Sequence, residues 1–371
     1  MEGLRARESR VLREVTSGGD AASAREFAED SFARHRRQAR FAPLGESGQA
    51  RLRASSALVV GLGALGSHLA ETLLRAGVGR LELIDRDVVE LQNLQRQSLY
   101  DERDAREACP KAIAAERRLR AIDGAVEIQA HVGEFDAAFW VSRVRALDVL
   151  LDATDNFATR YLLNDLAVRD GIPWVHGAVV GTEGQSAVVL PGETPCLRCL
   201  LDEPPAGYAI GSCETIGVLE PAVAAIAALQ SIEALKILAG RRDAVTRGLT
   251  RIDLWNGTHQ RFFAAALPRP ECASCGTREF PSLEAGTTPT VVLCGRDTVQ
   301  IRPARKITLD LDAVGRALAD AVTNLERTPH LLRISVDGCR IALFADARAL
   351  VFGTSDPLRA RALYDRWIGA S

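Results

Sequence analysis

The chain has 371 residues, of which 47% are apolar and 25% charged, as expected of a globular protein with two or three domains. Its 46 Lys and Arg against 48 Asp and Glu give a net charge of −2, which argues against nucleic acid or an anionic membrane as a general partner. No apolar run reaches the roughly 18 residues of a membrane span and the charged N-terminus has no signal core, so we expect a cytoplasmic protein whose eight cysteines are thiols or metal ligands.

Residues 1–54 are rich in Arg, Glu and Ala, and we expect a helical arm ahead of the first domain. Positions 21–41 are compatible with a helix that contains the basic cluster Arg34-His35-Arg36-Arg37-Gln38. By composition alone this cluster indicates a solvated helix face. The alternative is an arm that contacts phosphate, because guanidinium groups match phosphate oxygens.

Residues 58–67 predict a buried strand, a glycine turn and the start of an amphipathic helix. Gly61, Gly63 and Gly66 fit the spacing G-x-G-x-x-G, in which the glycines allow a tight turn, a phosphate close to the backbone, and contact between helix and strand. The helix N-terminus would then hold the phosphate. The next strand ends in Asp85, 19 positions after Gly66, where a carboxylate can accept hydrogen bonds from a ribose. The alternative is a glycine turn without a ligand.

From residue 55 to 280, short apolar strands alternate with helices, which predicts an α/β fold with a mostly parallel, Rossmann-like sheet. The expected strands after the first two are 126–130, 148–153, 174–178 and 185–190, and the expected helices are 112–122, 157–169 and 222–238.

Two C-x-x-C pairs, Cys196/Cys199 and Cys272/Cys275, bracket the last of these helices. Four thiolates form the ligand set of a closed tetrahedral zinc site, so we expect structural zinc (Zn2+). Four buried reduced thiols are the alternative. Between the pairs, Cys213 precedes a helix start at Pro221, and a thiol facing a helix N-terminus is activated as a nucleophile. A lone loop cysteine is more often inert.

Residues 281–289 contain Gly, Thr, Ser and Pro and predict a linker, followed by a small α+β domain at 290–371. The strands expected in that domain are 290–294, 298–302, 331–336, 340–345 and 349–353, with helices at 311–324 and 357–368. It contains no cluster that we identify as catalytic.

The polar residues after the early strands distinguish two kinds of nucleotide chemistry. Attack at the α-phosphate of ATP requires cations aimed at phosphate oxygens and a carboxylate for magnesium (Mg2+). Arg96, Lys111 and Asp155 supply these groups, and Asn93 could position a phosphate or ribose. Each alone could be an ordinary surface residue. Together they favour phosphate chemistry over hydride transfer by an NAD-dependent oxidoreductase.

In this order the motifs resemble those of the MoeB/ThiF/HesA family, bacterial relatives of ubiquitin-activating enzymes. The motifs are Gly61-x-Gly63-x-x-Gly66, Asp85-x-Asp87, Asn93-Leu94-Gln95-Arg96-Gln97, Pro110-Lys111, Asp152-Ala153-Thr154-Asp155-Asn156, Glu183-Gly184-Gln185 and the two C-x-x-C pairs. The resemblance covers about residues 34–276. It implies ATP-dependent adenylation of the C-terminal glycine carboxylate of a ubiquitin-like sulfur-carrier protein that ends in Gly-Gly.

The resemblance also assigns roles to residues. The implied nucleotide-binding set is Gly61, Gly63, Gly66, Asp85, Asp87, Asn93, Arg96 and Lys111. Asp155 resembles the magnesium carboxylate, and Arg37 resembles an arginine that reaches the ATP of a partner subunit, which implies a homodimer. Cys213 resembles a cysteine that in some members is linked covalently to the carrier or takes part in sulfur transfer, and that other members do not need.

Two features depart from the family pattern. The usual Cys-x-x-Ala-Gly is here Cys213-Glu214-Thr215-Ile216-Gly217, and Glu220 precedes Pro221. Because no rhodanese-like domain follows, a sulfur donor would act in trans. The C-terminal domain resembles an extension of some bacterial members, and recognition of the carrier or sulfur donor is its suggested role. An adenylating dehydratase for modified tRNA and a non-catalytic dimeric scaffold remain alternatives.

Overall fold

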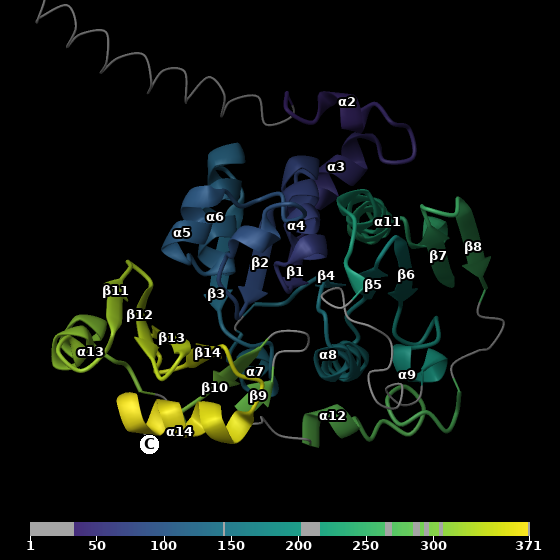
Figure 1. Cartoon of the computed structure of the whole chain (residues 1–371). Helices are drawn as coiled ribbons and strands as arrows, with labels where there is room; N and C mark the ends of the chain where they lie inside the picture. The colour runs from purple at the N-terminus through teal and green to yellow at the C-terminus, as the bar shows by residue number, and fades with distance from the viewer. Residues whose placement is uncertain are drawn as a thin grey trace, which may run out of the picture.

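The computed structural model describes residues 33–143, 145–201, 216–263, 269–284, 290–292, 297–303 and 307–369. They form two sheets with helices (Figure 1). The strands of the first sheet are β1 (Ser56–Val60), β2 (Arg80–Asp85), β3 (Glu127–Val132), β4 (Val149–Asp152), β5 (Trp174–Val180), β6 (Glu183–Val189), β7 (Leu249–Asp253) and β8 (Thr258–Phe262).

The order of the first sheet is β3-β2-β1-β4-β5-β6-β7-β8. The first five strands in this order, β3, β2, β1, β4 and β5, pair in parallel, and β6, β7 and β8 extend the sheet by antiparallel pairs. The mostly parallel α/β sheet is therefore confirmed. The antiparallel extension by β7 and β8 was not predicted.

Helices cover both faces of this sheet because the central strands are apolar on both sides. The helices of the first domain are α2 (Arg36–Ala39), α3 (Gly45–Ala54), α4 (Ala64–Ala76), α5 (Glu102–Glu107), α6 (Lys111–Ile122), α7 (Ala137–Ser142), α8 (Phe157–Asp170), α9 (Leu197–Leu200), α11 (Glu220–Leu238) and α12 (Pro281–Glu284), with the 3₁₀ turns η1 (Leu91–Asn93) and η3 (Arg242–Ala244). Val59 packs in one core with α4, α6 and α11, whereas Leu58 packs in a second core with α7 and α8. The side chains of successive residues in this strand thus pack on opposite faces of the sheet.

Helix α11 is the described helix that is long and apolar enough to cross a membrane. It contacts α4, β5 and β6, and Val223 and Ile226 are fully buried. These contacts are those of a core helix.

The described residues between 290 and 369 form a second, smaller domain, and the presence of a small α+β domain agrees with the predicted fold class. Its strands are β9 (Thr290–Val292), β10 (Thr298–Ile301), β11 (Asn324–Arg327), β12 (Leu331–Val336), β13 (Cys339–Phe344) and β14 (Ala349–Phe352), and its helices are α13 (Leu311–Leu318) and α14 (Pro357–Trp367). The antiparallel order is β11-β12-β13-β14-β10-β9, and both helices pack in one core on one face of this sheet.

Three local predictions need correction. The helix expected at 311–324 ends at Leu318, and Asn324–Arg327 is strand β11, which pairs with β12. The linker expected at 281–289 begins with α12, which packs on α8. In the described part of the arm, the helix expected at 21–41 covers Arg36–Ala39, and α3 follows as a separate helix.

Candidate functional site

The glycine turn joins β1 to α4 at the carboxyl edge of the parallel strands. Gly61 has φ +87°, and a Cβ there would lie 2.7 Å from the Ala153 carbonyl oxygen. A Cβ at Gly66 would lie 1.9 Å from the Gly61 carbonyl oxygen. At Gly63 the space is open, since an added Cβ would meet only Gln97 Nε2 at 3.9 Å. The chain itself therefore requires the first and third glycines, while the second leaves the backbone accessible to a phosphate.

Asp85 ends β2 and braces this turn. Its carboxylate accepts hydrogen bonds from the backbone N–H of Leu62 (2.6 Å) and of Asp87 (2.6 Å). The Tyr100 hydroxyl donates to the Leu62 carbonyl (2.7 Å) and holds the turn from the other side. Burial raises the pKa of the Asp85 carboxyl, and the nearby Lys111 ammonium opposes this shift. A ribose would thus meet a carboxylate whose orientation is already fixed.

Lys111 is the first residue of α6, and it is 2% exposed. Its Nζ lies 3.3 Å from Asp87 Oδ2, and its backbone N–H donates to the Asp87 carbonyl (2.9 Å). An ammonium has three hydrogens to donate. This buried cation therefore retains donors for an anionic ligand at the sheet edge.

The loop after β2 carries polar groups that lack partners within the described part of the chain. Asn93 is fully buried, and its Oδ1 accepts from the Glu90 N–H (3.0 Å), but its Nδ2 is unpaired. Gln97 Oε1 is also buried and unpaired. Arg96 is half-buried and donates to the Gln92 carbonyl (2.9 Å), with no ion pair to any residue that the structure describes. Because an orphaned buried polar group costs about 1–3 kcal/mol, this loop fits a polar ligand.

Asp155 lies in the turn after β4, and its carboxylate is exposed. The next residue, Asn156, caps α8 by accepting from the Thr159 N–H (2.9 Å). Asp152 fixes the turn, because its Oδ1 accepts from both the N–H (3.0 Å) and the hydroxyl (2.7 Å) of Thr154. The exposed Asp155 carboxylate is therefore available to a cation in solution.

A buried ionic cluster beneath this turn was not predicted. The second oxygen of Asp152 lies 2.7 Å from His176 Nδ1 and 3.4 Å from Arg160 Nε. Burial alone would raise the pKa of Asp152, but Arg160, His176 and Thr154 outweigh it and hold the pKa below its ordinary value. The sequence signal was an aspartate that closes the apolar run Val149–Asp152.

Arg37 lies apart from the other predicted site residues. It is exposed on α2, and its neighbour Gln38 donates to the carbonyl of Ala76 at the C-terminal end of α4 (2.8 Å). The glycine turn lies at the opposite end of α4, about 20 Å away for a helix of 13 residues. Arg37 therefore does not belong to the nucleotide site of its own chain.

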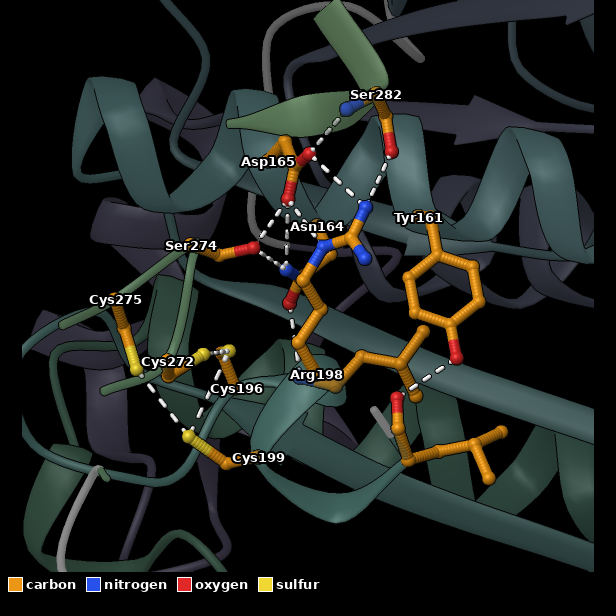
Figure 2. Close-up of polar contacts among 12 residues, drawn as sticks. Tyr161, Asn164, Asp165, Cys196, Arg198, Cys199, Cys272, Ser274, Cys275 and Ser282 are labelled. Atoms are coloured by element: carbon orange, nitrogen blue, oxygen red, sulfur yellow. Dashed lines mark hydrogen bonds and ion pairs between the residues drawn. The ribbon is translucent and has the colours of Figure 1, made fainter. Parts of the chain in front are cut away.

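The four cysteines of the C-x-x-C pairs meet near Asn164 and Asp165 of α8 (Figure 2). Their sulfur atoms all lie within 4.8 Å of one another, with Cys196 to Cys272 at 3.5 Å and Cys199 to Cys275 at 3.3 Å. Four sulfurs around one zinc ion lie about 3.8 Å apart. Burial raises the pKa of the Cys275 thiol to about 12, so a cation is needed to keep such a set deprotonated. The geometry fits one closed tetrahedral metal site.

A polar network ties this four-cysteine cluster to α8. Asn164 and Asp165 are fully buried in α8. Asn164 Nδ2 donates to the Ser274 hydroxyl (3.1 Å), while its Oδ1 accepts from the Leu197 N–H (2.8 Å). Asp165 accepts from Arg198 (3.2 Å), from the Ser282 N–H (2.9 Å) and from the Ser274 hydroxyl (Figure 2). Both C-x-x-C pairs and α12 are thereby held against α8.

Cys213 lies outside the described residues, so the structure does not place it.

Comparison with known proteins gives the family. A profile of the ThiF family matches residues 35–274. The sulfur carrier protein ThiS adenylyltransferase of Bacillus subtilis (strain 168) is 44% identical over 338 residues, which cover 91% of this chain and 99% of the relative. The chain belongs to the ThiF family.

Other ThiF-type relatives are shorter matches. The sulfur carrier protein adenylyltransferase of Thermus thermophilus is 37% identical over 70% of this chain and 97% of its own length. The SAMP-activating enzyme E1 of Haloferax volcanii is 36% identical over 65% of this chain and 87% of its own length. Among solved structures, E. coli MccB with ATP covers 62% of this chain and 68% of its own, with a TM-score of 0.54 and 20% identity, a likeness of fold.

The structure brings most of the predicted nucleotide residues of this ThiF-family chain to one edge of the sheet. The glycine turn, Asp85, Asp87 and Lys111 are linked by hydrogen bonds, and Asn93 and Arg96 follow in the adjoining loop. Asp155 lies close enough for its charge to act on Arg86. Arg86 was missed because an arginine after a strand has no distinctive signal.

Proposed function

We propose that this chain adenylates the C-terminal glycine carboxylate of a ubiquitin-like sulfur-carrier protein that ends in Gly-Gly. The carboxylate oxygen attacks the α-phosphorus of ATP, a new P–O bond forms, and pyrophosphate leaves. The observation that carries the proposal is a set of polar groups in the loops at the carboxyl edge of the sheet. The set is the unpaired Asn93 Nδ2, the buried Lys111 ammonium, the Arg96 guanidinium and the exposed Asp155 carboxylate. The names of the relatives support the same reaction. The chain is an adenylyltransferase of the ThiF type.

Each residue has a distinct task. Asp85 holds the ribose, and the N-terminus of α4 faces the phosphates. Lys111 and Arg96 neutralise the negative charge that develops on the α-phosphate and on the departing pyrophosphate. Asp155 would hold magnesium, and the ion would supply additional positive charge to the phosphates.

The remaining assignments concern assembly and later steps. Arg37 reaches the site of a partner subunit in a homodimer, which agrees with its exposure at the far end of α4. Zinc at the four cysteines is structural, because no ligand position remains for a substrate. The Cys213 thiolate attacks the acyl carbon of the adenylate, so that a thioester bond forms and AMP leaves; the alternative role of Cys213 is in sulfur transfer from a donor in trans. Use of ATP agrees with a cytoplasmic location.

Carrier-dependent exchange of labelled pyrophosphate into ATP tests the reaction. We expect Asp155→Ala and Arg96→Ala each to lower the exchange rate by about 100-fold or more. Asp365→Ala, which removes an exposed carboxylate from α14, is the matched control and keeps the wild-type rate. Strong exchange in either site variant would contradict these assignments.

Mass spectrometry identifies the substrate. Candidate carriers ending in Gly-Gly are incubated with enzyme, ATP and magnesium, and the true carrier gains the mass of one adenylyl group (AMP less water). A carrier that binds without gaining AMP would instead indicate a non-catalytic scaffold. Stimulation of ATP turnover by tRNA would indicate the dehydratase alternative.

A further inference from the structure

The second domain packs directly beside the nucleotide site, and this contact has no assigned role. One face of its sheet is covered by α13 and α14. The other face packs on the first domain through an apolar cluster that we call the interdomain cluster, formed by Val88, Ala108, Leu331, Ala342, Phe344 and Leu350. Val88 lies three residues after Asp85. In Figure 1 the domain lies next to β3 and α5, at the edge of the sheet.

Glu134 joins the two domains by ion pairs. It follows β3, where the Gly133 N–H donates to the Asp85 carbonyl (2.9 Å). Its carboxylate lies 2.7 Å from Arg86 Nη1 and 2.8 Å from Arg302 Nη2 of the second domain. The amide of Gln300, turned so that its nitrogen faces Glu134, donates at 3.2 Å. These side chains are 20% exposed or less, where ion pairs are screened weakly by solvent.

Arg348 provides a second connection. It lies in the turn between β13 and β14, is 4% exposed, and its Nη1 donates to the backbone carbonyl of Arg86. Its guanidinium carbon lies 4.1 Å from the centre of the Phe344 ring. The α14 helix braces the turn, because the Tyr364 hydroxyl donates to the Ala347 carbonyl (2.7 Å). A guanidinium is costly to bury, and this one is aimed at the segment that follows Asp85.

That segment carries the nucleotide-binding groups. Asp85 holds the glycine turn through Leu62, and Asp87 contacts Lys111 through both its carboxylate and its carbonyl. Arg86 lies between them in the sequence. Its carbonyl accepts a hydrogen bond from Arg348, and its guanidinium donates one to Glu134. A shift of residue 86 would therefore move Asp85 and Asp87 together.

We propose that the second domain is a clamp on the nucleotide site, in which Arg348 and Arg302 are positioning residues that hold residues 85–87 in the ATP-binding geometry. The clamp acts on the ATP side of the reaction, beside β2 and β3. This role differs from the suggested recognition of a carrier or sulfur donor, which would require contact with the substrate itself. The kinetic consequence rests on the proposed adenylation, whereas the structural consequence does not.

The kinetic test uses the full-length chain and pyrophosphate exchange. We expect Arg348→Met to raise the KM for ATP about tenfold and to leave the KM for the carrier within twofold of wild type. Arg348→Lys, which keeps a cationic donor, should recover most of the loss. The matched control is Arg333→Met, because Arg333 donates across the same interface to the Arg106 carbonyl in α5, a helix without nucleotide-binding residues. The control keeps the wild-type KM for ATP.

Hydrogen–deuterium exchange gives a readout that does not need activity. The amides of Asp87, Val89 and Lys111 are hydrogen-bonded in the wild-type structure. In Arg348→Met they should exchange at least about threefold faster, while β5 and β6 stay protected. If Arg348→Met does not fold, Arg302→Gln replaces it, with the same direction and a smaller change.

The outcomes separate the two proposals. A wild-type KM for ATP together with wild-type protection at these amides in Arg348→Met would overturn the clamp. Uniform loss of protection across the second domain with an unchanged KM for ATP would also overturn it, since Arg348 would then be merely structural. Suppose that hydrogen–deuterium exchange in Arg348→Met is faster only at residues 85–111, and that the wild-type protein adenylates no carrier. This result would support the clamp and refute the proposed function.

Discussion

The four-cysteine cluster and the candidate nucleotide site use the same kinds of polar side chain in opposite ways. Around the four-cysteine cluster, Asn164 uses both ends of its amide, and Asp165 accepts hydrogen bonds from Ser274, Arg198 and the Ser282 N–H. At the nucleotide site, Asn93 uses one end of its amide and leaves Nδ2 buried and unpaired within the described chain.

The carboxylates show the same contrast. Asp165 is fully buried among its partners, whereas Asp155 is exposed. A satisfied network stabilises the fold, and removal of one member leaves a buried polar group without a partner. A site with unpaired groups gives up stability and gains affinity for a ligand that completes it. The contrast predicts that substitutions near the cysteines affect stability, and that substitutions at the sheet edge affect nucleotide binding.

The largest effect on stability should come from the metal ligands. Cys272→Ser removes a thiolate from the closed site, and we expect the thermal midpoint to fall by about 10 °C or more. Chelation of the wild-type protein should produce the same shift, and elemental analysis should give one zinc per chain. A zinc-free wild-type protein with an unchanged midpoint would show that the four cysteines are ordinary buried thiols.

The next largest effect should come from the buried carboxylate of Asp165, beside the four cysteines. Asp165→Ala removes the ion-pair partner of the Arg198 guanidinium, which keeps its hydrogen bond to the Ser282 hydroxyl, and this costs about 3 kcal/mol of unfolding free energy. The double variant Asp165→Ala/Arg198→Met should cost less than the single variant, because it removes both charges. Urea unfolding measures both. Equal losses in the two proteins would mean that the ion pair contributes nothing beyond packing.

At the nucleotide site the stability cost should be smaller and the binding cost larger. Asn93→Ala removes one hydrogen bond to the Glu90 N–H, worth about 1 kcal/mol. Calorimetry should show ATP affinity reduced about tenfold, since the unpaired Nδ2 is lost as well. If stability fell by several kcal/mol while ATP affinity stayed constant, the two regions would not differ as described.

The smallest effect concerns acid stability. The folded pKa of Asp152 is lowered by Arg160 and His176, despite burial. The unfolded state therefore binds more protons between the two pKa values. The contribution of Asp152 is present above its unfolded pKa of about 3.9 and is lost as the pH falls through the lower folded value. Urea unfolding from pH 6 to pH 3 should show a weaker dependence on pH for Asp152→Asn than for wild type.

The sequence alone predicted which residues lie at the carboxyl edge of the sheet, because the spacing of those residues along the chain is set by the local geometry of the turn. Gly61 and Gly66 occur where the turn forces a positive φ or a close approach to backbone, and Asp85 ends the next strand. The spacing of the cysteines also predicted that the two C-x-x-C pairs lie together, since two such pairs in one chain are typical of the ligands of one shared metal. These features are readable because few other residues satisfy the same local demand.

Only the tertiary structure decided which distant residues support the site. Nothing in the sequence near Arg348 indicates that it reaches the Arg86 carbonyl, 262 positions away, or that Glu134 pairs with Arg302. The helix expected at 311–324 is shorter for a related reason: α13 ends at Leu318, and a turn leads the chain into Asn324–Arg327, which pairs with β12. Residue spacing predicts the relative positions of groups that are a few residues apart in one segment. Contacts between domains depend instead on how the surfaces of two folded domains pack.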